Sequence, residues 1–287
     1  MLFCFVILHF KTAEDTKLCI ESIERLDTPH EVRIIVVDNA SGNGSVEALM
    51  RTFAGHDNVE FILNRENLGF ARGNNAGYAR ARALKADFIA VMNNDTAVDS
   101  PDFVEGVQAL YDETGFALMG PDIVSMVDGG HQNPPAIFPA DPKKVRRLML
   151  KYWSLRLLNR LNVYDLLYDM KKEHPSQKAR PFVRERRENV QLHGACIVYS
   201  PAFIAHEPYA FCPETFLYTE EAILYRYCLR KGYKTLYDPR LRILHKEDSS
   251  TNALVRTSRA KREFLYTNLI ASHKVYLRQL KEAPLKW

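Results

Sequence analysis

The segment DFIAVMNND, residues 87–95, joins a continuous apolar run to three short polar side chains, Asn93, Asn94 and Asp95. An apolar run of this length predicts a strand that is buried on both faces of a parallel sheet. The polar residues have two interpretations. They form an ordinary turn, where Asn and Asp are common, or they lie on the rim of a ligand crevice, because ligands bind beyond the carboxyl ends of the strands in open α/β sheets.

The chain before this segment alternates between apolar runs and amphipathic stretches. Three further runs predict strands, Leu2–Leu8, Val32–Asp38 and Val59–Asn64. Each is followed by a stretch with apolar residues at helical spacing, and the second such stretch carries Val46, Leu49, Met50 and Phe53. Strands that alternate with helices predict a mostly parallel sheet covered on both faces. We therefore predict an α/β fold that is doubly wound and Rossmann-like.

After Pro121 the alternation stops. Residues 128–142 contain two glycines and four prolines and predict a loop. The stretch Lys143–Tyr168 interleaves apolar residues with Lys and Arg, which is typical of basic amphipathic helices. The elements expected beyond it are a strand over His193–Ser200, a helix that ends at Gly232, two short strands, and a helix over residues 254–280.

The composition is that of an ordinary globular chain. It has 287 residues, of which 46% are apolar and 26% charged, enough for one large domain or a domain with an appendage. The opening MLFCFVILHF has no basic start and no cleavage site and is too short to span a bilayer, so it predicts a buried strand. Five cysteines, none in a CxxC pair, indicate neither a disulfide framework nor a zinc site and favour a reducing cytosol.

Positive charge is concentrated in one region. The net charge of the whole chain is +4, but Ala140–Val190 alone contains 14 Lys and Arg against 6 Asp and Glu. Regional charge of this kind predicts a surface with an anionic partner. The basic, apolar insert over residues 143–187 has two interpretations, contact with a membrane or an anionic ligand and, alternatively, a basic lid or a dimer contact.

Three single residues are candidates for ligand or metal binding. Asp95 suits Mg²⁺ or Mn²⁺, because such ions keep water and substrate phosphates as most of their ligands and need few protein oxygens. Asp38, in VVDNASG, can accept hydrogen bonds from a nucleobase or a ribose. Both carboxylates also fit ordinary turns. His245 ends the run RILH, where an imidazole is either a metal ligand or a hydrogen-bonded structural residue.

The segment NLGFARGNNAG, residues 67–77, is rich in glycine but lacks the GxGxxG spacing, which argues against hydride transfer. Its Arg72 suits a diphosphate, because a guanidinium group can pair with two phosphate oxygens. The alternative is an ordinary solvent-exposed helix arginine.

Glu220 and Glu221 form the second carboxylate cluster. They follow an aromatic-rich stretch that we interpret as a strand, and they predict a general base in a partly desolvated place. Alternatively they simply open a helix, whose dipole favours acidic residues at its start.

Seven segments, in this order, resemble the family 2 glycosyltransferases, particularly the bacterial rhamnosyltransferase-like members that build surface polysaccharides. The segments are VILHFKTAEDTKLCIESI, VVDNASGNGS, NRENLGFARGNNAG, DFIAVMNNDTAV, HGACIVYSPAF, FLYTEEAILYRYCLRKGYKTLYDP and RILH. The resemblance covers most of residues 1–250. It implies a GT-A fold and inverting transfer of a sugar from a UDP- or dTDP-sugar to a saccharide or a lipid-linked saccharide.

The resemblance also implies roles for single residues on the donor side. His9 and Phe10 are expected to flank the nucleotide, Asp38 to hold its base, and Arg72 to lie near the base and the diphosphate. Asp95 matches the last residue of the family's DxD motif, the ligand of a divalent Mg or Mn ion. The remaining donor-side positions are Asn67 at a strand end and Asn93 and Asn94 in the leading positions of that motif.

On the acceptor side, Glu220 and Glu221 match the family's Glu-Asp pair, whose second member is the base toward the acceptor hydroxyl. Glu221 is one methylene longer than the usual Asp, which leaves open which glutamate acts. His245 matches a histidine that joins the metal or the diphosphate in several members. The acceptor, expected to be a saccharide or a polyprenyl-diphosphate-linked saccharide, is a candidate ligand of the insert over residues 143–187.

The resemblance and the composition together predict four parts. These are a nucleotide-sugar-binding α/β half over residues 1–125, a loop and basic helical insert over 126–190, an acceptor-binding and catalytic half of the same domain over 191–250, and a helical tail over 251–287. We expect a cytoplasmic enzyme that is peripheral at the inner face of the membrane, forms a homodimer and has no nucleic-acid partner.

Two other classes share parts of this pattern. A nucleotidyltransferase can have the same α/β core, but such enzymes usually carry a glycine-rich basic loop after the first strand, and HFKTAEDTK contains no glycine. The second alternative is a saccharide-binding module that keeps the fold without turnover.

Overall fold

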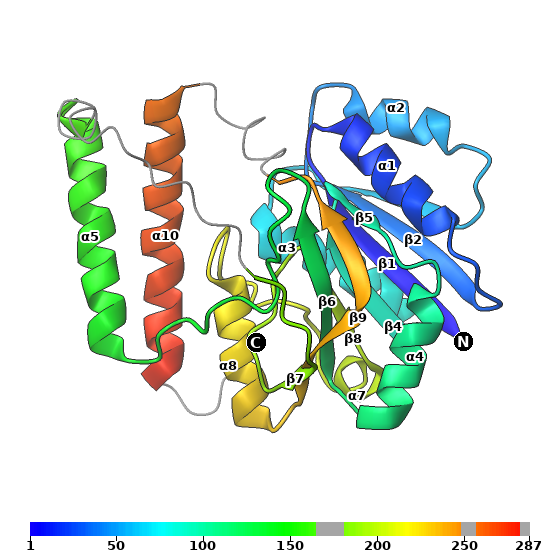
Figure 1. The fold of residues 1–287 in the computed structure, drawn as a ribbon. Helices are drawn as coiled ribbons and strands as arrows, with labels where there is room; N and C mark the ends of the chain where they lie inside the picture. Colours follow the sequence, from blue (N-terminus) through cyan, green and yellow to red (C-terminus); the bar gives the residue numbers. More distant parts are fainter. Residues whose placement is uncertain (165–180, 248–256, 282–287) are drawn as a thin grey trace.

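The computed structural model describes residues 1–164, 181–247 and 257–281. Within these residues nine strands form one mixed sheet in the order β3-β2-β1-β4-β8-β6-β9-β5, with β7 paired to β9 (Figure 1). Helices cover both faces of this sheet. The predicted α/β class is therefore confirmed.

The first half of the sheet is parallel, as predicted. It contains β1 (Leu2–His9), β2 (Glu31–Asp38), β3 (Val59–Leu63) and β4 (Phe88–Asn93). β1 pairs with both β2 and β4, in a register that places His9 beside Asp38 and Leu8 beside Asn93. The carboxyl ends of β1, β2 and β4 therefore meet at one edge of the sheet.

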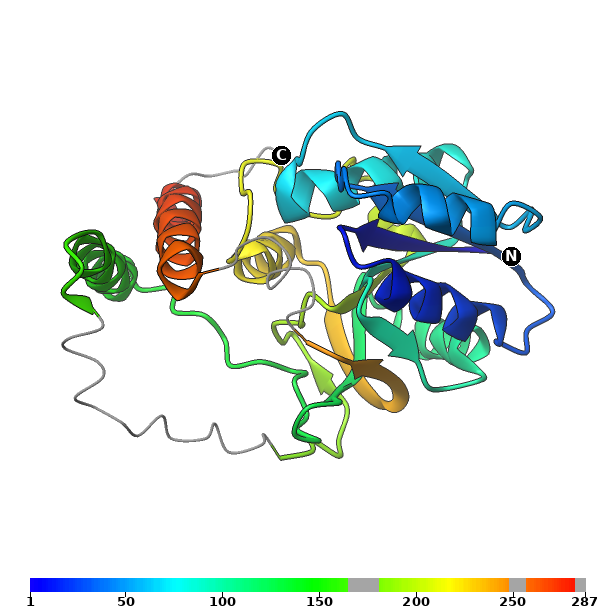
Figure 2. The same ribbon diagram turned by 90° about the horizontal axis from the view of Figure 1, so that it is seen from above.

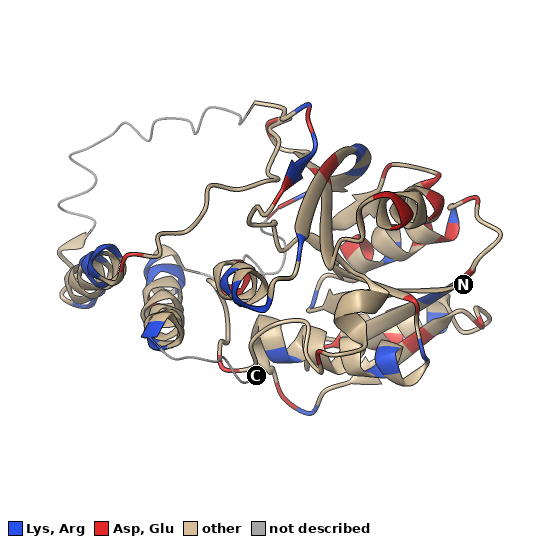
Figure 3. Cartoon of the chain, turned by 90° about the horizontal axis from the view of Figure 1, so that it is seen from below, with Lys and Arg blue, Asp and Glu red and all other residues tan. Residues whose placement is uncertain are grey.

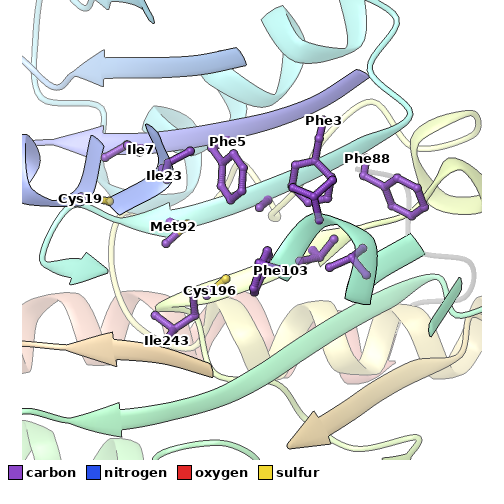
Figure 4. Packing of buried hydrophobic residues seen from close by; sticks show 14 of the residues in the cluster. Phe3, Phe5, Ile7, Cys19, Ile23, Phe88, Met92, Phe103, Cys196 and Ile243 are labelled. Carbon is purple, nitrogen blue, oxygen red and sulfur yellow. The ribbon is translucent and has the colours of Figure 1, made fainter. Parts of the chain in front are cut away.

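Four helices accompany this half: α1 (Ala13–Glu24), α2 (Ser45–Thr52), α3 (Gly69–Ala83) and α4 (Phe103–Thr114). Successive side chains of a strand point to opposite faces. Phe3, Phe5 and Ile7 of β1 pack with α1, α2 and α4 on one face (Figure 4). Cys4 and Val6 pack with α3 on the other face. Burial on both faces explains why this strand is apolar throughout.

The second half of the sheet is mixed. Its strands are β5 (Thr96–Val98), β6 (Leu118–Ser125), β7 (Arg187–Glu188), β8 (Cys196–Tyr199) and β9 (Thr235–His245). β8 lies between β4 and β6 and is antiparallel to both, whereas β6 and β9 are parallel. Strands from the early and the late parts of the chain therefore share one sheet.

Two expectations for this half are wrong. The alternation does not stop at Pro121, because β6 runs through it. The register between β6 and β9 shifts between Pro121 and Asp122, and such an irregularity tolerates a residue without an N–H. β9 is also one strand rather than two short ones, and it passes the same irregularity at residues 239–241.

The remaining helices are α5 (Pro142–Arg160), α7 (Pro201–Ile204), α8 (Glu220–Lys231) and α10 (Ser258–Lys281). α8, α10 and α5 lie in a row beside the sheet (Figures 1 and 2). α8 contributes Leu224 to the core against the sheet and Ile223 to a separate cluster with Tyr276 of α10 and Val145 of α5. The row is thus joined to the sheet through α8.

All five cysteines are free and buried. Among the described helices, none combines the length and the apolar character needed to cross a bilayer.

Candidate active site

A cavity of about 210 Å³ lies at the carboxyl ends of β1, β2 and β4. Its walls come from these strand ends, the start of α3, the loop before α8, the end of β9 and one side of α10. The lining residues are Leu8, Phe10, Asn39, Asn67, Gly69, Phe70, Asn93, Asn94, Asp95, Phe216, Leu217, His245 and Phe264.

Asp95 and His245 meet at this cavity. Asp95 lies in the turn between β4 and β5 and is 9% exposed. β5 pairs with β9 so that Thr96 is opposite His245, and this register brings the imidazole to the carboxylate. His245 Nε2 and Asp95 Oδ1 are 3.3 Å apart. The backbone N–H of Lys246 donates to the carbonyl of Asp95 at 2.9 Å, so the backbones are joined as well.

Gln132 orients this imidazole from the loop after β6. Its Oε1 lies 2.7 Å from His245 Nδ1. A neutral histidine that donates Nδ1–H to this carbonyl oxygen turns the lone pair of Nε2 toward Asp95. Two acceptor atoms that face each other attract a cation or a proton. A histidine that binds a metal usually donates its other N–H to such a carbonyl or carboxylate.

Asn93 and Asn94 have different parts in the turn. The N–H of Asn93 donates to the carbonyl of Ala195 at 3.0 Å. Asn94 is 2% exposed, and its Nδ2 donates to the hydroxyls of Thr12 and Thr16 at 2.7 and 2.9 Å. The amide group of Asn94 therefore anchors the turn that carries Asp95 to the start of α1.

Of the predicted pair His9 and Phe10, only Phe10 lines the cavity. The imidazole of His9 is fully buried, 2.7 Å from the hydroxyl of Thr16 and 2.8 Å from that of Ser45. Burial lowers its pKa. A neutral histidine held by two hydroxyls positions the end of β1 and does not face the cavity.

Asp38 lies at the end of β2 and is 4% exposed. Its Oδ1 accepts a hydrogen bond from the hydroxyl of Ser41 at 2.5 Å, and the N–H of Ser41 lies 3.3 Å from both carboxylate oxygens. Its neighbour Asn39 lines the cavity, whereas Asp38 lies just behind it. The predicted contact of Asp38 with a nucleobase stays a prediction.

Asn39 connects the end of β2 to the start of α3. Its Nδ2 donates to Oδ1 of Asn67 at 2.9 Å, and its own Oδ1 accepts from Asn64 at 3.2 Å and from the N–H of Leu68 at 2.9 Å. Asn67 is among the predicted site residues. Asn39 is not, although it directly follows Asp38 at a strand end, which is the signal that could have identified it.

Arg72 does not line the cavity. It is exposed on α3, and its Nε donates to the carbonyl of Pro213 at 2.8 Å. This position matches the alternative of a solvent-exposed helix arginine, and it joins α3 to the loop before α8. A role at the diphosphate stays a prediction.

The loop before α8 closes over the start of α3. The N–H of Phe70 donates to the carbonyl of Phe216 at 2.7 Å. Gly69 has a φ of +77°, and a Cβ at this position would lie 2.3 Å from the same carbonyl oxygen, so only glycine fits. The ring of Phe264 on α10 packs edge-on to Phe216, with centroids 6.3 Å apart. These apolar residues of the wall have no counterpart in the sequence prediction.

Glu220 and Glu221 are the first residues of α8. The stretch before them is a turn and not the strand that the sequence predicts. Its last two residues, Tyr218 and Thr219, have φ values of 72° and 74°. Left-handed backbone costs a residue with a side chain about 1–2 kcal/mol. Packing of the loop therefore maintains a strained turn just where it delivers the two glutamates.

The two carboxyl groups have different surroundings. Glu220 is 2% exposed, and its Oε1 has no hydrogen-bond partner among the described residues. Burial, together with the charge of Glu221, raises the pKa of Glu220 to about 8. Glu221 is half-buried, and burial raises its pKa too, although the N–H of Gly194 donates to its carboxylate. The pair therefore retains a proton near neutral pH, and Glu221 is its more accessible member.

A short series of contacts connects this pair with Asp95. A Cβ on Gly194 would lie 2.4 Å from Oε1 of Glu221, so the carboxylate rests directly against the backbone there. The ring of the adjacent His193 has its centroid 5.9 Å from that of His245. His245 in turn contacts Asp95. The structure thus brings carboxylates from distant parts of the chain to one end of the sheet.

The metal-binding potential of the site rests on few side chains. In the described part of the chain no cluster of three or more His, Cys, Asp or Glu residues surrounds a common point. Asp95 and His245 supply an oxygen and a nitrogen at the cavity. This small set fits an Mg²⁺ or Mn²⁺ ion that takes its other ligands from phosphates and water.

A comparison with protein families gives a match over residues 4–188 to the family described as Glycosyl transferase family 2. The chain belongs to this family. The matched range includes Asp38 and Asp95. Glu220, Glu221 and His245 of this family 2 chain lie beyond it.

Among curated proteins, the chain is similar to the low-salt glycan biosynthesis hexosyltransferase Agl10 of Haloferax volcanii. The two are 25% identical over 121 residues, which are 42% of this chain and 36% of the relative. The family 2 chain therefore matches only about a third of the length of this curated relative.

Among solved structures, the fold is similar to crystal structures of S. aureus TarS 1-349, alone, with UDP and with UDP-GlcNAc. The TM-score is 0.53 in each case, at 12%, 11% and 13% identity. The alignments cover 97%, 96% and 100% of this chain and 73%, 72% and 68% of the TarS chains. This likeness concerns the fold, and it agrees with the predicted GT-A class.

Proposed function

We propose that the chain transfers a sugar from a nucleotide diphosphate donor to an acceptor hydroxyl, with inversion at the anomeric carbon. The observation that carries the proposal is the meeting of two unlike carboxylate sites at one end of the sheet. Asp95 with His245 is suited to a cation-bound diphosphate, and Glu221 is suited to an acceptor proton. Membership of family 2 supports this class of reaction.

The donor diphosphate is proposed to lie at Asp95 and His245. These two residues would hold a divalent Mg or Mn ion, and Gln132 would keep the imidazole nitrogen directed at it. When bound, the ion offsets the negative charge that grows on the leaving diphosphate. Asn94 supports this arrangement indirectly, because its bonds to α1 fix the turn that carries Asp95.

The nucleotide is proposed to lie along Phe10, Asn67 and Asp38. Phe10 lines the cavity, and Asp38 can accept hydrogen bonds from a base or a ribose after rearrangement of its bond to Ser41. The UDP and UDP-GlcNAc in the TarS crystals support a uridine donor. The thymine of a dTDP-sugar has the same N3–H donor as uracil, so an aspartate at the base accepts from either. Arg72 would reach the diphosphate only after leaving the carbonyl of Pro213.

In the proposed step, the oxygen of the acceptor hydroxyl attacks the anomeric carbon while the bond from that carbon to the diphosphate oxygen breaks. The hydroxyl proton passes to the carboxylate of Glu221, and the nucleoside diphosphate leaves. A raised pKa suits this base, because it lets the carboxyl retain the proton that it takes. Glu220 holds the other proton of the pair, so a second negative charge is avoided at neutral pH. One displacement inverts the anomeric centre.

The acceptor is proposed to be a saccharide or a polyprenyl-diphosphate-linked saccharide in surface polysaccharide synthesis, at the inner face of the cytoplasmic membrane. Rhamnose is the sugar that the branch of the family suggests. The apolar wall of Leu217 and Phe264 beside the start of α8 supports a site for the acceptor next to the glutamates.

Two linked measurements test the proposal. Nucleotide sugars are first screened for thermal stabilisation in the presence of Mn²⁺, because a ligand that binds only the folded chain raises its apparent stability. The best donor is then used for transfer, and the anomeric configuration of the product is read by NMR. We expect a UDP- or dTDP-sugar to stabilise the chain and to give an inverted product.

A retained configuration would contradict the single displacement. Stabilisation without transfer across a broad acceptor panel would favour the binding module. Release of pyrophosphate from a nucleoside triphosphate and a sugar phosphate would favour the nucleotidyltransferase.

A further inference from the structure

One side of α5 carries a stripe of apolar side chains that no described residue covers. Leu150, Trp153 and Leu157 of α5 and Leu161, its C-cap, are 68%, 60%, 45% and 61% exposed. Their spacing of three or four residues places them on the same side of the helix. At 1.5 Å per residue the stripe is about 17 Å long. Exposed apolar residues are ordinary when scattered, but a continuous stripe indicates an interaction surface.

A different side of α5 is occupied by α10. Val145 is fully buried, and Asn159 donates to the carbonyl of Arg259 at 3.0 Å. The ring of Tyr152 stacks on Tyr266 with centroids 6.2 Å apart. The helix is therefore held firmly through these residues, and the stripe is not needed for its attachment to the fold.

Every charged side chain on α5 is basic, and Figure 3 shows this colouring along the helix. The residues are Lys143, Lys144, Arg146, Arg147, Lys151, Arg156 and Arg160. Arg156 and Arg160 are paired with Glu263 of α10. In the described part of the chain, Arg146 and Arg147 have no acidic partner. In the helical repeat Arg146 lies in line with the stripe, one turn before Leu150, and Arg147 lies next to the stripe.

We propose that this stripe, with Arg146 and Arg147 beside it, docks on the surface of an anionic lipid bilayer. Leucine side chains and a tryptophan would enter the boundary between headgroups and acyl chains, where amphipathic helices lie parallel to the membrane. The arginines would remain among the lipid phosphates, whose negative potential attracts basic residues near the surface. Docking needs neither donor nor acceptor, so it is independent of the proposed transfer reaction.

A second copy of the chain is the other occupant that an apolar stripe suggests. In a twofold dimer the same patch faces itself. Because every charged side chain on α5 is basic, such a dimer would bring basic residues of the two copies together, and like charges across an interface oppose association. An anionic bilayer satisfies both the apolar stripe and its basic border.

The first test measures co-sedimentation with vesicles. We expect the full chain to bind vesicles of mixed phosphatidylcholine and phosphatidylglycerol and to remain free of vesicles made of phosphatidylcholine alone. The double variant R146E/R147E should bind roughly tenfold more weakly or worse, because each arginine contributes to attraction by anionic lipid. The control is R25E/R51E, which changes the net charge by the same amount at the C-cap of α1 and on α2, far from α5 (Figure 1).

The second test follows Trp153 itself. Trp153 and Trp287 are the tryptophans of the chain, so the variant W287F leaves Trp153 as the single fluorophore. We expect its emission to shift to shorter wavelength when anionic vesicles are added. In the same background L150S/L157S should weaken binding, whereas L18S, at a leucine on α1 that is 47% exposed, should not.

Three results would overturn the proposal. They are the absence of binding to anionic vesicles, equal binding by R146E/R147E and the unmodified chain, and a dimer in light scattering that dissociates in L150S/L157S. The last result would assign the stripe to self-association. None of these measurements depends on glycosyl transfer. A negative result in the vesicle tests therefore does not contradict the proposed reaction, and the absence of transfer does not contradict membrane docking.

Discussion

Asp95 and the Glu220–Glu221 pair lie near each other at one end of the sheet, but their surroundings differ in kind. Asp95 faces the cavity with a single imidazole nitrogen 3.3 Å away, held by Gln132. The glutamates are two acids side by side at a strained turn, and burial raises the pKa of both. The first arrangement attracts positive charge, and the second retains a proton. Burial and neighbouring groups thus give the carboxyl groups of the site two different properties.

The largest effect is expected at the glutamates. Glu221→Gln keeps the shape of the side chain but removes the base, so we expect kcat to fall by about 10²–10⁴. Donor affinity, measured by thermal stabilisation, should stay within a few fold. Glu214→Gln, in the same loop but exposed, is the matched control and should retain full turnover. Nearly normal turnover in Glu221→Gln would break the assignment of the base.

At the other carboxylate, Asp95→Ala should lower kcat by about 10²–10³, because it removes preorganised support for the leaving diphosphate. Unlike Glu221→Gln, this variant should also lose the stabilisation by donor with Mn²⁺. Asp102→Ala, at an exposed aspartate that makes no side-chain cap bond, serves as the control. Equal loss of donor binding in Asp95→Ala and Glu221→Gln would contradict the distinction between the two regions.

The orientation of His245 gives a finer test. Gln132→Leu removes the acceptor for Nδ1–H, and we expect the Mn²⁺ concentration for half-maximal activity to rise about 10–100-fold. At saturating Mn²⁺ the rate should recover in large part. Gln132→Glu keeps an oxygen at this position and should retain metal affinity. Direct binding of Mn²⁺, followed by electron paramagnetic resonance with UDP present, provides a readout apart from activity.

Gly69 tests the contact between the loop before α8 and α3. Gly115 is its matched control, because both have positive φ, but a Cβ on Gly115 would meet nothing within 4 Å. Gly115→Ala should therefore cost about 1 kcal/mol of the free energy of unfolding. Gly69→Ala should cost about 1–3 kcal/mol more, because its Cβ would overlap the backbone of Phe216. If urea unfolding gave the same loss of unfolding free energy for Gly69→Ala and Gly115→Ala, the loop before α8 would be able to move away from the added Cβ at no cost.

The smallest effect concerns the pH dependence of stability. The pKa of Glu220 is about 8 in the folded chain against an ordinary value of 4.5, so the folded state binds this proton more tightly than the unfolded state. Its contribution to stability is present at low pH and is lost as the pH rises from about 4.5 to about 8. Glu220→Gln removes this loss.

We therefore expect the Tm of Glu220→Gln, relative to the unmodified chain, to increase from pH 5 to pH 8 by at least about 2 °C. Glu214→Gln should show no such trend. Parallel Tm curves for Glu220→Gln and the unmodified chain would contradict the raised pKa.

The fold of the first half follows from local sequence, because its strands are buried on both faces and are apolar throughout. The predicted runs agree with β1 to β4 to within one or two residues. The sequence pattern as we interpret it contains no helix over residues 103–114 and stops alternating at Pro121, whereas the structure has α4 and β6 there. In the second half, pairing between distant strands decides the structure. Pro121 does not end the strand, because the pairing of β6 with β9 is irregular at this point and tolerates a residue without an N–H.

The site divides in the same way. Asp95, His245 and the glutamates could be predicted, because they end strands or open a helix at recognisable motifs. Gln132 and Phe264 could not be predicted. Gln132 lies in a loop without periodicity, and Phe264 lies on a helix whose position beside the cavity is set by tertiary packing. The sequence places His9 at the correct strand end, but the direction of its side chain depends on hydroxyls from two separate helices.

The shared sheet has a consequence for synthesis on the ribosome. β4 obtains its second neighbour only from β8, which begins about a hundred residues later at Cys196. Until that segment emerges, the apolar run Phe88–Met92 forms the unprotected edge of a four-stranded sheet. The nascent chain therefore passes through a long interval in which it can pair with another copy. A chaperone that binds the exposed strand would protect the nascent chain during this interval.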